Sequence, residues 1–335
     1  MPSSSDAAVL SDRPVRGGFA GVLERFAPQD WLVLGYLVCV NVAVLRGVPG
    51  HVRDTGLLHV ALLFIWVAVG VSLVRSGVVR DGWLKAFAYR WTIYGPVQLT
   101  YFFFRDLLPV INPGSFDLEL HELDLALFGV EPAMFLDRFV NSTTTEWFAF
   151  FYFGYFFVLA LHVIPILFFS ANQRVLGEFA LGMLAVVCLG QTIYMLVPGF
   201  GPFRAMADSF HHPFPEGAWI EAVIGAVASG GALKDIFPSL HTALPAFIAL
   251  FSFKNRSLSP FRYTWPLVIF ASLNIIVATL FLRWHYLIDV VAGLFLACTT
   301  AWLTPGIIER DLLRRARLGL DPLWPEYGCR SRGDA

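Results

Sequence analysis

Two short segments carry side chains whose types and spacing suit nucleophilic and acid–base chemistry. Residues 237–243 read FPSLHTA and residues 283–293 read RWHYLIDVVAG, so that each segment places a histidine where an apolar block begins. His285 and Asp289 are four residues apart, which puts two side chains on one face of a helix. A carboxylate placed there can hold one imidazole nitrogen and make the other a better nucleophile. The second histidine, His241, could then act as an acid or a base.

Several residues near these histidines could bind an anion such as phosphate. Arg283 offers a planar guanidinium group that matches phosphate oxygens, and helix N-termini add backbone N–H donors. Ser239 could contact phosphate, although serine is also a preferred helix N-cap residue. Arg204, Lys234 and Arg105 are further candidates for phosphate binding, and each could instead be an ordinary side chain at the membrane interface.

The elements that must position these residues are membrane-spanning helices. Hydrophobic residues make up 57% of the 335-residue chain and charged residues only 15%, whereas soluble proteins carry about 25% charged residues. The net charge of −1 gives no basic excess for binding nucleic acid. Backbone polar groups in lipid must be satisfied within each segment, which favours helices. The sequence predicts eight spans, at 31–45, 57–74, 86–104, 147–169, 176–197, 239–253, 264–282 and 286–303.

The predicted fold is an all-α integral membrane protein with four regions along the chain. Residues 1–30 form an N-terminal segment, 31–75 two accessory helices and 86–304 a six-helix catalytic bundle, followed by a tail at 305–335. Basic residues outside the spans divide unevenly, with 16 in the loops on the side of the termini and 7 on the other side. The positive-inside rule therefore places both termini in the cytoplasm and the long loops 105–146 and 198–237 outside. We expect a multi-pass protein of the plasma membrane, with its active site on the extracytoplasmic side.

The first long loop and the span that follows it have features of their own. Residues 116–139 alternate leucines with acidic residues, which predicts short helices lying on the membrane surface. Asn141 begins a glycosylation sequon, whose use depends on the organism. The aromatic run at 147–157 either forms a groove for a lipid chain or faces the lipid. His211 and His212 could ligate a metal, but a solvated loop is the simpler interpretation, and no metal site is predicted.

The paired segments resemble the signatures of the type-2 phosphatidic-acid phosphatase superfamily, and most closely those of its inositol phosphorylceramide synthase branch. The resemblance implies that His285 attacks phosphorus to form a phosphohistidine, that Asp289 orients it and that His241 protonates the leaving oxygen. It also implies phosphate contacts from Ser239 and Arg283. It covers roughly residues 147–303 and requires no cofactor or metal.

The chain also departs from the phosphatase pattern of that superfamily. Leu240 stands where phosphatases usually have glycine, Thr279 replaces an arginine six residues before the second histidine, and the upstream lysine-and-arginine motif is not recognisable. These differences favour a lipid phosphotransferase that acts on a phospho-headgroup. A plain phosphatidate or polyprenyl-phosphate phosphatase and a non-catalytic lipid-binding or transport protein remain as alternatives. The sequence leaves the lipid substrate, the acceptor and the oligomeric state open.

Overall fold

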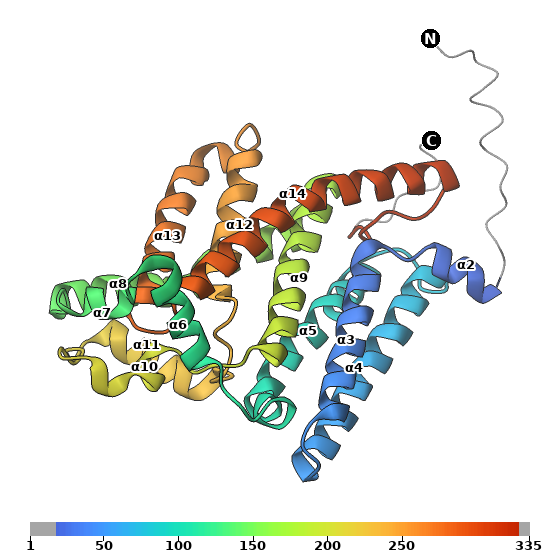
Figure 1. Ribbon diagram of the computed structural model, residues 1–335. Helices are drawn as coiled ribbons and strands as arrows, with labels where there is room; N and C mark the ends of the chain where they lie inside the picture. The colour runs from blue at the N-terminus through green and yellow to red at the C-terminus, as the bar shows by residue number, and fades with distance from the viewer. Residues whose placement is uncertain (1–17, 328–335) are drawn as a thin grey trace.

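The computed structural model describes residues 18–327, which form helices joined by loops and one isolated β-bridge between Gly199 and Asp235. Long helices make up most of the molecule (Figure 1). They are α3 (Pro28–Arg46), α4 (His51–Ser76), α5 (Trp83–Ile111), α8 (Ser142–Phe169), α9 (Gln173–Leu196), α12 (Leu240–Lys254), α13 (Phe261–Phe281) and α14 (Leu287–Leu318). The shorter elements are α2 (Gly18–Glu24), α6 (Asp117–Phe128), α7 (Pro132–Asp137), α10 (Pro202–Ala205), η1 (Ala207–Ser209) and α11 (Ala218–Gly230).

Each of the eight predicted apolar blocks coincides with a helix, but fewer of these helices have the composition of a membrane span. Six are long and apolar enough to cross a bilayer, namely α3, α4, α8, α9, α13 and α14. Helix α12 has only 15 residues, and the 29-residue α5 is long enough but too polar. The chain is therefore a multi-pass integral membrane protein with six candidate spans, and the count of eight stays a prediction.

Helix α9 lies between two groups of helices (Figure 1). On one side α3, α4 and α5 pack against one another, and α3 and α5 also contact α9. On the other side α12 packs against α8, α13 and α14, and also contacts α9. The helices predicted to be accessory are thus continuous with the rest of the fold, and α12, which carries His241, is surrounded by other helices.

A glycine brings the two helices that follow the signature segments close together. A Cβ atom on Gly293 of α14 would lie 2.5 Å from the carbonyl oxygen of Ser239 and 3.2 Å from Cβ of Thr242. Only a residue without a side chain fits at this distance. The close approach fixes the N-terminal end of α12 against the first turns of α14, and both ends carry a candidate catalytic histidine.

Part of the predicted tail at 305–335 is helical, and part of it packs against the helices. Helix α14 continues past residue 303 to Leu318, and the segment after it turns back onto α5, where Trp324 is fully buried against the ring of Tyr89. A buried ion pair between Arg75 and Asp30 lies beside it, and Arg75 also donates to the carbonyl of Leu323. Residues 1–17 and 328–335 of the predicted terminal segments, with the basic residues they contain, lie outside the described part of the chain.

Four acidic side chains of the first long loop are buried, whereas Glu119 and Glu122 of the same loop are exposed. The two predicted short helices exist, as α6 and α7. The placement of these short helices on the membrane surface stays a prediction. The buried residues, with at most 9% of each exposed, are Asp117, Asp124, Glu131 and Asp137. Buried carboxylates require hydrogen bonds or opposite charges, and in this protein the loops near the histidines supply them.

Candidate active site

His241 lies in the first turn of α12, and the local sequence explains why the helix begins there. The side chain of Ser239 is fully buried and accepts a hydrogen bond from the backbone N–H of Thr242, at 3.2 Å, as an N-cap residue does. The backbone N–H of Ser239 donates to the carbonyl of Asp289, at 3.0 Å, which ties the start of α12 to the other signature segment. In this structure Ser239 therefore has the capping role that the sequence left open beside phosphate contact.

His285 and Asp289 form the contact that their spacing predicts, with one difference in geometry. Nδ1 of His285 lies 3.3 Å from Oδ2 of Asp289, and both side chains are buried. His285 lies two residues before α14, which begins at Leu287, so that the pair does not share a helix face. The contact forms because Asp289 also accepts the backbone N–H of Tyr286, at 2.9 Å, and so folds the segment back onto the first helical turn.

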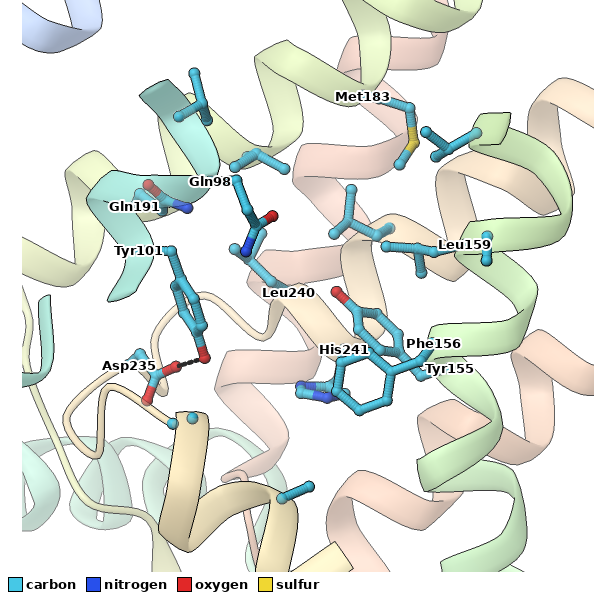
Figure 2. Close-up of a pocket in the computed structure, with 18 of the residues that line it drawn as sticks. Gln98, Tyr101, Tyr155, Phe156, Leu159, Met183, Gln191, Asp235, Leu240 and His241 are labelled. Atoms are coloured by element: carbon cyan, nitrogen blue, oxygen red, sulfur yellow. Dashed lines mark hydrogen bonds between the residues drawn. The ribbon is translucent and has the colours of Figure 1, made fainter. Parts of the chain in front are cut away.

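The two histidines face one another across a narrow gap. Their ring centroids are 6.4 Å apart. The ring of His241 lies between two tyrosines of α8, with centroids 4.4 Å from Tyr152 and 4.2 Å from Tyr155, and Figure 2 shows it beside Tyr155. Nε2 of His241 is buried and has no hydrogen-bond partner within residues 18–327. The structure thus brings together the imidazoles of two separate segments, and aromatic packing fixes the orientation of one of them.

Two buried aspartates of α6 hold the second signature segment in place. Asp124 accepts the backbone N–H groups of Leu287 and Ile288, at 2.6 and 2.8 Å, and so caps the N-terminus of α14. Asp117 accepts the hydroxyl of Tyr286, at 3.1 Å, and the N–H of Gly201, at 2.8 Å. Sequence analysis did not assign these roles, although Asp117, Leu120 and Asp124 share a helix face and this spacing was a usable signal.

Arg283 is held by α7 and by the second long loop. Its Nη2 donates to Oδ1 of Asp137, at 2.7 Å, and to the carbonyl of His212, at 2.6 Å. Its guanidinium carbon lies 4.1 Å from the ring centroid of Phe210 and 4.2 Å from that of Phe214. Its Nε is buried and has no hydrogen-bond partner in the described part of the chain. Arg283 therefore anchors the segment and still has a donor that could bind an anion.

Within residues 18–327, no hydrogen bond or ion pair connects the three other predicted phosphate-binding residues to either histidine. Lys234 is buried and its ammonium group donates to three backbone carbonyls, those of residues 112, 113 and 114, at 3.1, 3.1 and 2.6 Å. All three of its donors are thereby used. Arg204 is exposed, 4.6 Å from the ring centroid of Phe200. Arg105 is exposed and donates to the carbonyl of Ala228, at 2.7 Å. In this structure all three support loops or helix ends.

Burial affects the charge of the candidate nucleophile. It lowers the pKa of His285 to about 4, against the opposing effects of the Asp235 charge and the Ile236 carbonyl. Burial also lowers the pKa of Arg283, and Asp137 opposes that change. At neutral pH His285 is therefore an uncharged imidazole, which is the form that can act as a nucleophile.

This sequence matches a known family over the region that contains both histidines, Asp289 and Arg283. The match covers residues 118–303, more than half of the chain, and the family is the PAP2 superfamily. The chain belongs to the PAP2 superfamily. No curated protein and no solved structure gave a significant match. Membership in the PAP2 superfamily indicates a phosphatase-type enzyme that acts on membrane lipids, and it is consistent with the multi-pass membrane fold.

The PAP2 site also contains a carboxylate that sequence analysis missed. Asp235 lies six residues before His241, in the loop between α11 and α12, and Oδ2 accepts the hydroxyl hydrogen of Tyr101, at 2.9 Å (Figure 2). Burial raises the pKa of Asp235, and the Tyr101 hydrogen bond opposes that rise. The only signal in the sequence was its proximity to the first signature, because Tyr101 is 134 residues away in the sequence.

An apolar cavity of about 560 Å³ adjoins His241 of the PAP2 site. It lies among α5, α8, α9, α11 and α12, and His241, Asp235 and Tyr101 form part of its wall. Most of the remaining wall is aromatic or aliphatic, and the amides of Gln98 and Gln191 also line it (Figure 2). Volumes of about 300–1,000 Å³ are typical of pockets for small molecules and cofactors. The cavity is therefore large enough for part of an amphiphile.

The histidine pair in the second long loop has a structural role. The side chain of His212 contacts Asp137, with Nδ1 2.9 Å from Oδ2, and the backbone N–H of His211 donates to the same oxygen, at 3.0 Å. Within residues 18–327 no group of three or more His, Cys, Asp or Glu side chains is arranged to hold a metal ion. The two residues connect the loop to Asp137 and, through it, to Arg283.

Proposed function

We propose that the protein transfers a phospho-headgroup between membrane lipids through a phosphohistidine at His285, in the manner of inositolphosphotransferases. The main support for the proposal is the distance of 6.4 Å between the ring centroids of His241 and His285. The contact of Asp289 with Nδ1 of His285 adds to it. A phosphorus atom between the two rings is within reach of both imidazoles. Membership in the PAP2 superfamily supports phosphoryl chemistry on a lipid.

The first half of the reaction cleaves the donor lipid. Asp289 holds Nδ1 of His285, so Nε2 is the nitrogen that attacks phosphorus. The bond between phosphorus and the leaving oxygen breaks as the P–N bond forms, and His241 supplies the proton that the leaving oxygen takes up. A positioned acid of this kind contributes about 10²–10⁴-fold to the rate.

The second half of the reaction releases the group from His285. The oxygen of an acceptor alcohol, or of water, attacks phosphorus, the P–N bond breaks and its electron pair returns to the imidazole. The negative charge on the phosphoryl oxygens is offset by the unpaired Nε of Arg283 and by the N-terminus of α12. No metal ion is needed in this scheme. Ser239 contributes by capping the helix that bears His241, and phosphate contacts from Arg204, Lys234 and Arg105 stay predictions.

The apolar cavity favours an alcohol over water as the acceptor. It adjoins His241 and is lined mostly by apolar side chains, so a lipid chain can fill it and exclude water from the phosphohistidine. The alternative, a phosphatase for phosphatidate or polyprenyl phosphate, uses the same residues and differs only in the acceptor. We place the site on the extracytoplasmic side of the plasma membrane, because the loops on the opposite side are richer in basic residues.

Turnover by purified protein tests this function. The protein is incubated with phosphatidate, or with phosphatidylinositol together with ceramide or diacylglycerol, and both inorganic phosphate and new phospholipid are measured. We expect a new phospholipid from the wild type, no product from His285→Ala and product formation about 10²–10⁴-fold slower from His241→Ala. Free phosphate as the main product would favour the phosphatase. Turnover by both variants at the wild-type rate would exclude this mechanism, whereas no product from the wild type would leave a non-catalytic lipid-binding or transport role.

A further inference from the structure

The molecule contains one carboxylate near the histidines that the scheme above does not use. We infer that Asp235 is the base that takes the proton from the acceptor hydroxyl while the phospho group leaves His285, an inference that rests on the proposed function. His241 would then serve the first half of the reaction and Asp235 the second. Three features of Asp235 support this role, namely its position in the cavity wall, its uncompensated charge and its access to a lipid alcohol from the membrane.

Asp235 lies where an acceptor for the group on His285 must bind. It shares the wall of the apolar cavity with His241, and its charge and the carbonyl of the next residue, Ile236, both act to raise the pKa of His285. Tyr101, which reaches it from α5, fixes the carboxylate by donating to Oδ2 (Figure 2). The carboxylate is thus held in one orientation, in the same cavity wall as His241.

The charge of Asp235 has no cation to neutralise it. No Lys or Arg lines the cavity, and Asp235 takes part in no ion pair within residues 18–327. The other acidic residues near the site are engaged, since Asp289 binds His285 and the backbone while Asp137 binds Arg283. A carboxylate removed from water without a cation is stabilised by taking up a proton. Burial raises the pKa of Asp235, which makes it a stronger base than an exposed carboxylate.

The same negative charge assigns the cavity to the acceptor. A carboxylate repels the phosphate of a donor lipid, whereas it accepts a hydrogen bond from a hydroxyl group. Phe102, Phe156 and Ile164 line the cavity and are also 52%, 50% and 51% exposed on the outer surface of their helices. The cavity therefore opens sideways between α5 and α8, and a lipid alcohol can bring its chain in from the membrane with its hydroxyl towards Asp235.

The proposed step balances protons and bonds. The acceptor O–H proton moves to the carboxylate of Asp235 as the new O–P bond forms, and the P–N bond to His285 breaks with its electron pair returning to Nε2. His241 gave its proton to the first leaving oxygen. Transfer of the proton from Asp235 to His241, which lines the same cavity, returns both groups to their starting states.

Single-turnover labelling of Asp235→Asn separates the two halves of the reaction. Protein in nanodiscs is mixed with phosphate-labelled phosphatidate and, in a second arm, with labelled phosphatidylinositol, and protein-bound label is followed before and after diacylglycerol is added. We expect Asp235→Asn to acquire label at close to the wild-type rate and to lose it about 10²–10⁴-fold more slowly, as expected when a general base is removed. Acquisition of label also shows that the variant is folded.

Three further proteins make the result decisive. Glu221→Gln removes an exposed carboxylate of α11 outside the cavity, and it should lose label like the wild type. Tyr101→Phe should slow the loss of label but less than Asp235→Asn, and His285→Ala should acquire none. Loss of label from Asp235→Asn at the wild-type rate overturns the inference and leaves the proposed function intact. If the wild type acquires no label from either donor, the proposed function fails, and the inference fails with it.

Discussion

Replacing Asp289 by Asn tests the support of the nucleophile with little change in shape. The amide oxygen can still accept the N–H of Tyr286, the bond that a side chain at the third helical position makes back to the N-cap residue. The charged contact to Nδ1 of His285, 3.3 Å in the structure, is lost. A hydrogen bond to a charged group contributes about 1.5–3 kcal/mol, and 3.3 Å lies at the long end of the usual range. Loss of about 1.5 kcal/mol of transition-state stabilisation corresponds to a rate about tenfold lower. The positive charge that develops on the imidazole during attack strengthens the contact, so the fall in rate can approach about 10²-fold.

The assay compares Asp289→Asn with the wild type in the formation of labelled protein and in thermal unfolding. We expect label to form about 10–10²-fold more slowly, while the free energy of unfolding changes by less than about 1 kcal/mol. Formation within twofold of the wild-type rate would refute the role of Asp289 in orienting His285. A large fall in stability with an equal fall in activity would show that capping α14, and not activation of the imidazole, is the main role of Asp289.

Three other perturbations have defined outcomes. Gly293→Ala should cost about 1–3 kcal/mol of stability and reduce turnover, because its Cβ would lie 2.5 Å from the Ser239 carbonyl; Gly306→Ala, with open space in the same helix, should be neutral or stabilising by up to about 1 kcal/mol. Equal effects on thermal unfolding and turnover would contradict this account of the helix contact. Asp137→Asn should lower stability by about 3–5 kcal/mol because Arg283 loses its buried partner, and an unchanged unfolding midpoint would argue against that pair. Burial lowers the pKa of His285 from 6.5 to about 4, so kcat/KM should persist as pH falls through 6.5 and decline only near pH 4, where the nucleophile becomes protonated; a decline centred at 6.5 would show an unperturbed histidine.

Local sequence was sufficient for the helices and for one contact of the site. Each apolar block forms a helix because backbone groups in a nonpolar setting must bond within their own segment. The four-residue spacing of His285 and Asp289 predicted their contact even though His285 precedes the helix. The approach of His241 to His285 followed from a resemblance between two paired segments, since no local rule relates residues so far apart in sequence.

The remaining features depend on contacts between distant segments. Lys234 lies close to His241 in sequence, yet its side chain turns away to three carbonyls at the end of α5 and just beyond it. Arg283 has a suitable type and position, but whether it was free depended on Asp137, 146 residues earlier. Asp124 caps α14 from 163 residues away. In the sequence, these acidic residues resemble the polar face of a surface helix. The backbone donors that bind them belong to other loops, so local sequence does not indicate their burial.

Mapping the labelled residue tests the central claim most directly. After a brief reaction with labelled donor, the protein is denatured under alkaline conditions, which preserve phosphohistidine, and its peptides are sequenced by mass spectrometry. The account predicts the phospho group on His285 in the wild type, a slower appearance of it at the same residue in His241→Ala, and none in His285→Ala. A modification on any other residue, or turnover by the wild type without covalent label while His285→Ala remains active, would contradict it.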